Sequence, residues 1–292
     1  MAVRARAEWE RLEEELGVRL LGREGVLVCG PNVPERAAAF EVAEVPARLV
    51  NRDGQAEALP VIAPPEDEAL LDELGGSIDV RAAVDGLAAA LGDRVVLAQV
   101  FELDERTDGV RLRTSEGLCS ADRVIVCAGA QIHALSEQLG IPIPLQIELH
   151  ARASFRAREP GADLACLQDR SGKHGEVVYA APMPDGREYA IGLGTEHEPP
   201  VDDALSRLRA YVERGMPGLD PEPLSVRLCR TSILAWGADA FAVWRVGAID
   251  VLAGANLFKF APLVGELLAE GSDELSPERQ LGGTAAASRS GR

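Results

Sequence analysis

Residues 121–130 read ADRVIVCAGA, a short apolar run that ends in a turn of small residues. This composition is typical of a buried β-strand that leaves its sheet through a tight turn. The preceding segments predict a helix over residues 79–91, with Asp79 as its N-cap, and then an antiparallel meander over residues 94–120. The order of helix, meander, buried strand and turn indicates an α/β domain.

Segments at both ends of the chain fit the same domain. Residues 248–255 read AIDVLAGA, which predicts a second buried strand, and residues 260–271 follow as a helix. Apolar residues at steps of three and four predict another helix over residues 5–16, which Gly17 ends. Residues 272–292 are rich in Gly, Ser, Ala and charge, and are predicted to form a disordered tail.

The middle of the chain has a different pattern. Residues 18–30 alternate around Gly25 like a two-stranded hairpin, and residues 51–66 are polar and predict loops with one short strand. A helix is predicted over residues 202–215, where Gly215 ends it and Pro217 follows. Three strand-like segments that could form one sheet lie at residues 149–157, 176–183 and 187–194.

The two kinds of segment alternate along the chain. A length of 292 residues is enough for two domains with separate cores. One domain is predicted over residues 1–16, 75–144 and 228–271, and the second over residues 17–74 and 145–227. Two domains are therefore expected to be interleaved in sequence.

Charge and cysteine content restrict the function classes. The formal net charge of −17 would repel phosphate backbones and anionic lipid surfaces, so neither nucleic acid nor a membrane is expected as a partner. Five cysteines without a CxxC pair argue against a disulfide framework and favour a reducing cytoplasm. The first residues lack the apolar core of a signal peptide, and the chain has no run of eighteen apolar residues. The sequence therefore predicts a soluble cytoplasmic protein.

Seven stretches, in one order from about Glu8 to Glu270, resemble the sarcosine and N-methyl amino-acid oxidases within the D-amino-acid oxidase-like flavoprotein family. Each stretch is weakly specific alone, but independent short patterns seldom fall in one order by chance. The stretches are WERLEEELGVRLLGREGVLVCGP (9–31), GGSIDVRAAVDGLAAAL (75–91), ADRVIVCAGA (121–130), EVVYAAPM (176–183), RGMPGL (214–219), LCRTS (228–232) and LFKFAPLVGELLA (257–269).

The resemblance implies a flavin oxidase that binds an extended FAD, with the pyrophosphate on a helix N-terminus in an amino-terminal GxGxxG unit. These 292 residues contain no GxGxxG, and about sixty residues of a typical member have no counterpart. The implied fold is α/β plus α+β: an incomplete FAD-binding Rossmann-like domain interleaved with an antiparallel-sheet substrate domain. The first predicted domain would then bind FAD and the second would bind substrate.

The resemblance also assigns residues to the flavin. Cys229 matches the cysteine that bonds covalently to the flavin ring in sarcosine oxidases, and Arg230 beside it could favour the thiolate. The alternative for Cys229 is a buried strand residue. Gly129 and Ala130 match the turn after the buried strand, with a tight strand exit as their alternative, and Val100 matches a strand valine at the adenine, with a core valine as its alternative. Gly254 and Asn256 stand where the family has a glycine-rich run before its FKF sequence.

Two residues match the substrate site. Lys259, between Phe258 and Phe260, matches the lysine near the substrate carboxylate and flavin, and its alternative is a solvated loop lysine. The two phenylalanines predict that the helix begins in a buried position. Tyr179 matches a tyrosine of the substrate pocket, and its alternative is a half-buried strand residue. We assign both as candidate catalytic residues.

Departures from the family pattern concern the substrate. Ala190 stands where sarcosine oxidases have the lysine that assists oxygen, Gly194 where they have a pocket histidine, and Thr231 where a tyrosine is common. Sarcosine itself is therefore not the expected substrate. The four histidines show no metal-ligand spacing, so no metal is predicted.

Two functions of different classes remain open at this stage. The first is an FAD-dependent oxidoreductase that oxidises a C–N bond of an amino acid or amine. The second is a truncated or divergent relative that does not bind FAD alone. Such a relative would act as a ligand-binding module, or as one half of a hetero-oligomeric oxidase in which a protein partner completes the FAD site.

Overall fold

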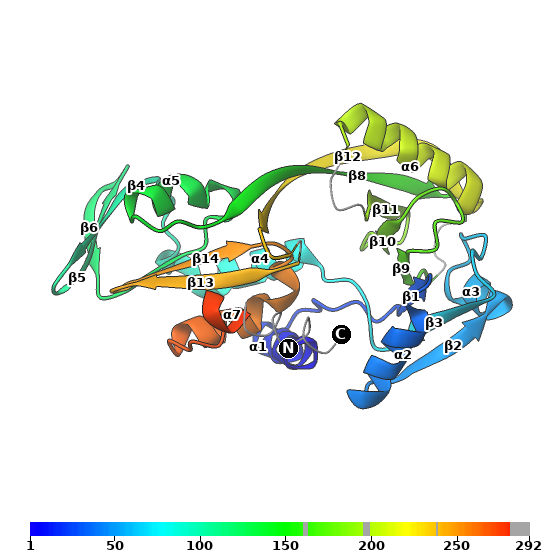
Figure 1. Ribbon diagram of the computed structural model, residues 1–292, viewed down its shortest axis with the longest axis horizontal. Coiled ribbons are helices and arrows are strands. Elements are labelled where there is room, and N and C mark those ends of the chain that lie inside the picture. Colours follow the sequence, from blue (N-terminus) through cyan, green and yellow to red (C-terminus); the bar gives the residue numbers. More distant parts are fainter. Residues whose placement is uncertain (160–162, 195–198, 238, 281–292) are drawn as a thin grey trace, which may run out of the picture. The chain divides into compact units, whose positions relative to one another are not determined.

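The computed structural model describes residues 1–159, 163–194, 199–237 and 239–280. The chain forms two compact units, each made of separate stretches of sequence (Figure 1). The first unit comprises Met1–Gly17, Asp85–Glu148 and Arg230–Arg292, and the second comprises Val18–Val84 and Leu149–Cys229. That the first unit binds cofactor and the second binds substrate stays a prediction.

The first unit contains two three-stranded sheets. In one, β14 lies between β13, to which it is antiparallel, and β7, to which it is parallel. The other is the antiparallel meander β4-β5-β6. The elements are α1 (Ala2–Leu16), β4 (Val100–Arg106), β5 (Gly109–Thr114), β6 (Gly117–Ala121), β7 (Val124–Val126), η2 (Gly129–Gln131), α5 (Ile132–Gln138), β13 (Phe241–Val246), β14 (Ile249–Gly254), η3 (Phe258–Phe260) and α7 (Ala261–Ala269).

Helices α1 and α7 lie side by side in this unit (Figure 1). Helix α1 ends at Gly17, which has a φ of 66° and caps the helix with its N–H on the Glu13 carbonyl. Such a left-handed cap favours glycine because glycine has no Cβ to clash. Trp9 of α1 is buried, while the apolar face of α7 packs with the inner residues of β13 and β14.

The second unit is built on an eight-stranded sheet with the order β12-β8-β11-β10-β9-β1-β3-β2. From β8 to β2 the neighbouring strands are antiparallel, except for the parallel pair of β1 and β9. The elements are β1 (Val26–Cys29), α2 (Val33–Val42), β2 (Ala47–Asn51), α3 (Arg52–Ala58), β3 (Glu68–Asp72), β9 (Cys166–Asp169), β10 (Val178–Pro182), β11 (Glu188–Leu193) and α6 (Val201–Gly215). Three elements belong to both units: α4 (Val80–Leu91), β8 (Leu145–Ala157) and β12 (Leu219–Leu234).

The largest core of the chain lies on one face of this sheet. Along β8 the residues Ala151, Ala153 and Phe155 are buried, while Arg152 between them faces the opposite side. Helix α6 covers the buried face (Figure 1), and its Leu208 and Tyr211 belong to the same core. The other face of β8, β11 and β10 carries the polar side chains.

Long helices and local strands are as predicted from the sequence. Helix α4 begins after Asp79, whose carboxylate accepts a hydrogen bond from the Ala82 N–H at 3.0 Å. The meander is antiparallel as predicted, although its first strand begins at Val100 rather than near residue 94. The strands predicted over residues 149–157, 176–183 and 187–194 pair as β8, β11 and β10 in one sheet.

Three predictions were wrong. Residues 18–30 form no hairpin, because β1 pairs with β3 and β9 instead of with the segment before Gly25. Residues 51–66 include helix α3, whose cap is Asn51: its side chain accepts from the Gly54 N–H at 3.0 Å. The predicted disordered tail is folded at its start, because Leu275 is buried and its carbonyl accepts from the Val243 N–H. The rest of that tail, residues 281–292, lies outside the described residues.

Candidate functional site

Two turns lie at the carboxyl edge of the parallel strand pair in the first unit. Strands β7 and β14 run in the same direction, with Val126 opposite Val251, so their carboxyl ends meet at one edge. Gly129 begins η2 after Cys127 and Ala128, which follow the end of β7, and η2 contacts β14. Gly254 ends β14. The carboxyl edge of parallel strands is the usual place of ligand sites in open α/β sheets.

The glycines of the two turns differ in what a side chain at each position would meet. Gly254 has a φ of 134°, and a Cβ there would lie 2.3 Å from the Ala240 carbonyl oxygen. Close packing on β13 therefore requires glycine at this position, whatever binds nearby. Gly129 has a φ of 53°, but a Cβ there would meet no atom within 4 Å. The backbone at Gly129 therefore faces open space, and Ala130 beside it is half-buried.

Asn256 has a positive φ of 55°, a conformation that asparagine adopts more readily than most residues. Its side-chain amide donates a hydrogen bond to the Asp239 carboxylate. This contact gives Asn256 a structural role in holding the turn between β14 and η3. Any role of Asn256 at the flavin remains a prediction.

Lys259 lies in η3, immediately before α7. Its backbone carbonyl accepts a hydrogen bond from the Trp9 indole Nε1 at 3.0 Å, and the Trp9 and Phe258 rings are 5.5 Å apart. The Lys259 ammonium lies 5.3 Å from the centroid of the Phe260 ring and forms no hydrogen bond or ion pair with the described part of the chain. Helix α1 therefore fixes the backbone of this turn and leaves the ammonium available to a ligand.

The burial expected around Lys259 was wrong. Lys259 is exposed, and Phe258 is 37% exposed, because the start of α7 lies at the surface of this unit. Val100 is 38% exposed at the start of β4, so its alternative as a core valine is also wrong. A ligand that approaches either residue finds it accessible within the first unit.

The same sheet contains a buried carboxylate. Asp250 of β14 is 1% exposed and accepts hydrogen bonds from Arg245 Nε, at 2.7 Å, and from Arg123. The two guanidinium groups also donate to the carbonyls of Ala269 and Gly271, at the end of α7. Burial acts to raise the pKa of Asp250, but the hydrogen bonds and charges of Arg245 and Arg123 outweigh it and hold that pKa below its usual value. This cluster ties α7 to the sheet.

Tyr179 of β10 lies on the polar face of the sheet in the second unit and is 38% exposed. Its register partner on β11 is Gly192, and the register partner of Gly192 on β8 is Arg152. The Arg152 guanidinium carbon lies 5.7 Å from the centroid of the Tyr179 ring. The sequence pattern identified Tyr179 but gave no sign of Arg152, because their proximity depends on the pairing of three strands.

Cys229 lies on β12 and is exposed, so its alternative as a buried strand residue is wrong. Cys29 and Cys166 are instead buried, and burial raises the pKa of each thiol well above its usual value. Cys119 of β6 is exposed like Cys229. Among the candidate residues, Cys229 therefore offers an accessible thiol for covalent chemistry.

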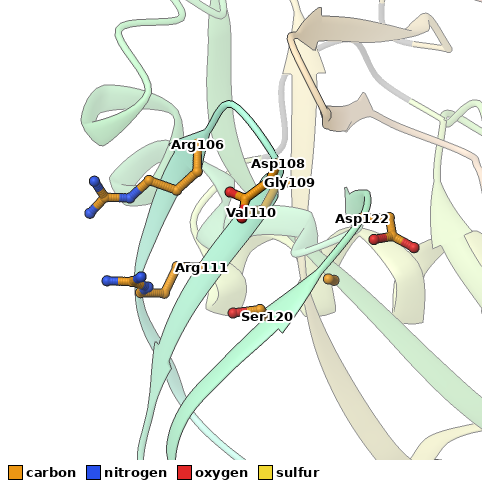
Figure 2. Close-up of a pocket in the computed structure, with 8 residues that line it drawn as sticks. Arg106, Asp108, Gly109, Val110, Arg111, Ser120 and Asp122 are labelled. Atoms are coloured by element: carbon orange, nitrogen blue, oxygen red, sulfur yellow. The ribbon is translucent and has the colours of Figure 1, made fainter.

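A hollow in the meander does not have the size of a cofactor site. It has a volume of about 140 Å³, below the roughly 300 Å³ at which small-molecule pockets begin. Figure 2 shows Arg106 and Arg111 on its β4 and β5 walls, and Asp108 and Asp122 at its turn end. Its lining includes two arginines and two aspartates, so the formal charges of these four residues balance. Across the described residues, no group of His, Cys, Asp or Glu could hold a metal ion.

The family described as FAD dependent oxidoreductase, DAO, matches residues 1–271, which include both units. The monomeric sarcosine oxidase of Bacillus sp. (strain B-0618) is 27% identical over 245 residues, which cover 76% of this chain and 63% of that protein. The chain thus spans less than two thirds of the length of this relative. No helix within the described ranges is long and apolar enough to cross a membrane.

Solved structures share the fold at lower identity. NikD, an amino acid oxidase of nikkomycin biosynthesis, aligns with a TM-score of 0.77 at 21% identity, covering 92% of this chain and 78% of its own. L-proline dehydrogenase from P. horikoshii aligns with a TM-score of 0.78 at 19% identity, covering 97% and 83%. The α/β and antiparallel architecture implied by the sequence is therefore confirmed. Together with the family match over residues 1–271, these findings place the chain in the DAO family of FAD-dependent oxidoreductases.

Proposed function

We propose that this chain acts as an FAD-dependent oxidoreductase that oxidises a C–N bond of an amino acid or amine. The family match carries this proposal because it runs through both units, over residues 1–271. Related proteins are named as a sarcosine oxidase, an amino acid oxidase and an L-proline dehydrogenase, and each name refers to an amino acid as substrate.

The residues at the carboxyl edge of β7 and β14 fit a flavin cofactor. The backbone at Gly129 faces open space, which permits its amide to approach a ligand closely. Lys259 presents an ammonium from a turn whose backbone is held by Trp9. FAD, when bound, supplies the two-electron acceptor chemistry that amino-acid side chains lack. In this proposal Lys259 holds the substrate carboxylate by a charge-assisted hydrogen bond, and Tyr179 donates its hydroxyl to the substrate.

We also propose that a partner protein completes the ADP site and that the protein works in the cytoplasm. The chain contains no GxGxxG sequence, and β7 is an edge strand of its three-stranded sheet. An open strand edge can pair with another protein segment. The cytoplasmic assignment is supported by the reduced thiols, because all five cysteines are unpaired in the described structure.

Uptake of FAD and its attachment to Cys229 can be measured together. The protein is incubated with FAD, freed of excess cofactor and precipitated with acid. We expect flavin to stay with the wild-type pellet, and to move to the supernatant in the Cys229→Ala variant, since only a covalent thioether survives denaturation. The matched control is Cys119→Ala, which removes another exposed thiol. Flavin in the supernatant for all three proteins would refute attachment at Cys229, and a folded protein that takes up no FAD would refute FAD binding by this chain without its partner.

A further inference from the structure

Strand β12 is an edge strand of the eight-stranded sheet, and much of it is exposed on both faces. Among the described residues it pairs with β8 alone and ends the strand order. Residues 224–230 are all exposed, and three of them are large and apolar: Leu224 is 44%, Val226 is 41% and Leu228 is 52% exposed. An open edge that carries apolar side chains favours pairing with a further strand.

Hydrogen bonds at the end of β12 show which main-chain groups face outward. The Ala235 N–H donates to the carbonyl of Pro144, the residue before β8, at 3.0 Å. The Leu234 carbonyl points the other way and accepts from the Gly237 N–H at 3.1 Å. Main-chain groups of alternate residues in a strand point to the same side. Val226 and the other even-numbered residues of β12 therefore direct their N–H and C=O groups away from β8.

The same even-numbered residues share one face of the strand. The Glu222 carboxylate pairs with Arg209 of α6 at 2.7 Å, so Glu222 lies on the face that α6 covers. The Ser225 hydroxyl lies 2.8 Å from the Ser154 hydroxyl of β8, on the opposite, polar face. Side chains alternate between the two faces of a strand. The row on the α6 face therefore consists of Glu222, Leu224, Val226, Leu228 and Arg230.

This row is complementary to itself. It begins with an acid, continues with three apolar residues and ends with a base. Two antiparallel copies related by a two-fold axis at Val226 would place Glu222 of each copy opposite Arg230 of the other. Leu224 of each copy would lie opposite Leu228 of the other. Opposite charges and apolar side chains are the cross-strand pairs that stabilise a sheet, and a two-fold interface requires such self-complementarity.

The charged groups at the ends of the row can accept these contacts. Arg230 is exposed and forms no hydrogen bond or ion pair with another residue in the described ranges. The Glu222 side chain is 73% exposed, and Arg209 donates to its Oε1 atom, which leaves Oε2 for a second guanidinium. The main chain fits as well, because Val226 directs its N–H and C=O outward and can exchange both hydrogen bonds with Val226 of a second copy.

We infer that β12 is the interface of a homodimer, in which two copies of the chain pair edge to edge about a two-fold axis at Val226. The occupant is a second copy because the charges and apolar residues along β12 complement the same strand in the opposite direction. Cys229 projects from the other face of β12, so this pairing leaves its thiol accessible. The inference is independent of the proposed function and is tested without FAD or turnover.

The first test exchanges the charges and measures the dimerisation constant by sedimentation equilibrium. Glu222→Arg and Arg230→Glu each place like charges opposite one another at both ends of the pair. We expect each variant alone to dimerise about 10- to 100-fold more weakly than the wild type. An equal mixture of the two variants restores both ion pairs and should form a heterodimer with wild-type affinity. A mixture that associates no more tightly than either variant alone would overturn the inference.

The second test removes the central hydrogen bond. Val226→Pro lacks the outward N–H, and an edge strand tolerates proline where the N–H faces solvent. This variant should stay folded by circular dichroism and be monomeric. The matched control for the charge variants is Glu41→Arg, which makes the same charge change on α2, beside β2 at the far end of the sheet, and should dimerise like the wild type. A wild type that is monomeric at every concentration, or a dimer that these β12 variants leave unchanged, would contradict the inference.

Discussion

Replacement of Lys259 by Met is expected to lower kcat/KM for an amino-acid substrate by about 10- to 100-fold, with the fold unchanged. The ammonium has no hydrogen-bond or ion-pair partner among the described residues, so its removal costs the folded protein little. The substrate carboxylate would lose a charge-assisted hydrogen bond. Steady-state kinetics with added FAD and a dye as electron acceptor measure the effect, and thermal unfolding checks the fold.

The chain supplies a natural control for this experiment. Lysine occurs at only two positions in the sequence, Lys173 and Lys259, although Lys and Arg together number 30. Arginine therefore serves almost everywhere as the surface cation, and a lysine at position 259 is unusual. Lys173 is exposed in the second unit, and Lys173→Met should leave kcat/KM unchanged. Equal kinetics for Lys259→Met and Lys173→Met would contradict the role assigned to Lys259.

Replacement of Asp250 by Asn is expected to lower the free energy of unfolding by about 3 kcal/mol, the effect of removing one partner from a buried ion pair. The substitution leaves Arg123 and Arg245 without their shared carboxylate and weakens the link between β14 and the end of α7. Urea unfolding followed by circular dichroism measures the change. Asp108→Asn, at an exposed turn, is the control and should unfold like the wild type.

The stability that Asp250 provides should depend on pH. Because the pKa of Asp250 is lowered in the folded protein, its contribution is complete above the usual carboxyl pKa of about 4 and is lost as the pH falls through the lowered value. The difference in unfolding free energy between wild type and Asp250→Asn should therefore be constant near neutral pH and shrink in acid. A difference that stays constant down to about pH 2 would contradict this assignment.

The sequence predicted the elements that depend on local patterns. Helix α4 follows from its apolar period and the cap at Asp79, and β14 from its continuous apolar run. The sequence did not predict strand pairs whose two strands lie far apart along the chain. Strand β1 pairs with β3, some forty residues later, and with β9, about 140 residues later, and neither partner can be read from the alternation around Gly25. Helix α3 was missed because its seven residues are too few to show a period.

In the candidate site, too, some residues could be predicted from the sequence and others could not. Resemblance identified single positions such as Lys259 and Tyr179, but not the residues that hold them. Trp9 lies 250 residues from Lys259 in sequence, and only the packing of α1 on α7 brings its indole to the Lys259 carbonyl. Arg152 meets Tyr179 only because β11 lies between their strands and has a glycine at the crossing. Contacts of this kind depend on tertiary structure, which a single sequence does not specify locally.

FAD bound to this protein is expected to be reduced by an amino acid. The most direct measurement is anaerobic titration of the FAD-loaded protein with primary, secondary and cyclic amino acids, followed by the visible absorbance of the oxidised flavin. Bleaching of that absorbance by at least one amino acid, and its return when an electron acceptor is added, is the predicted result. A folded protein whose bound FAD stays oxidised with every amino acid and amine would contradict the account.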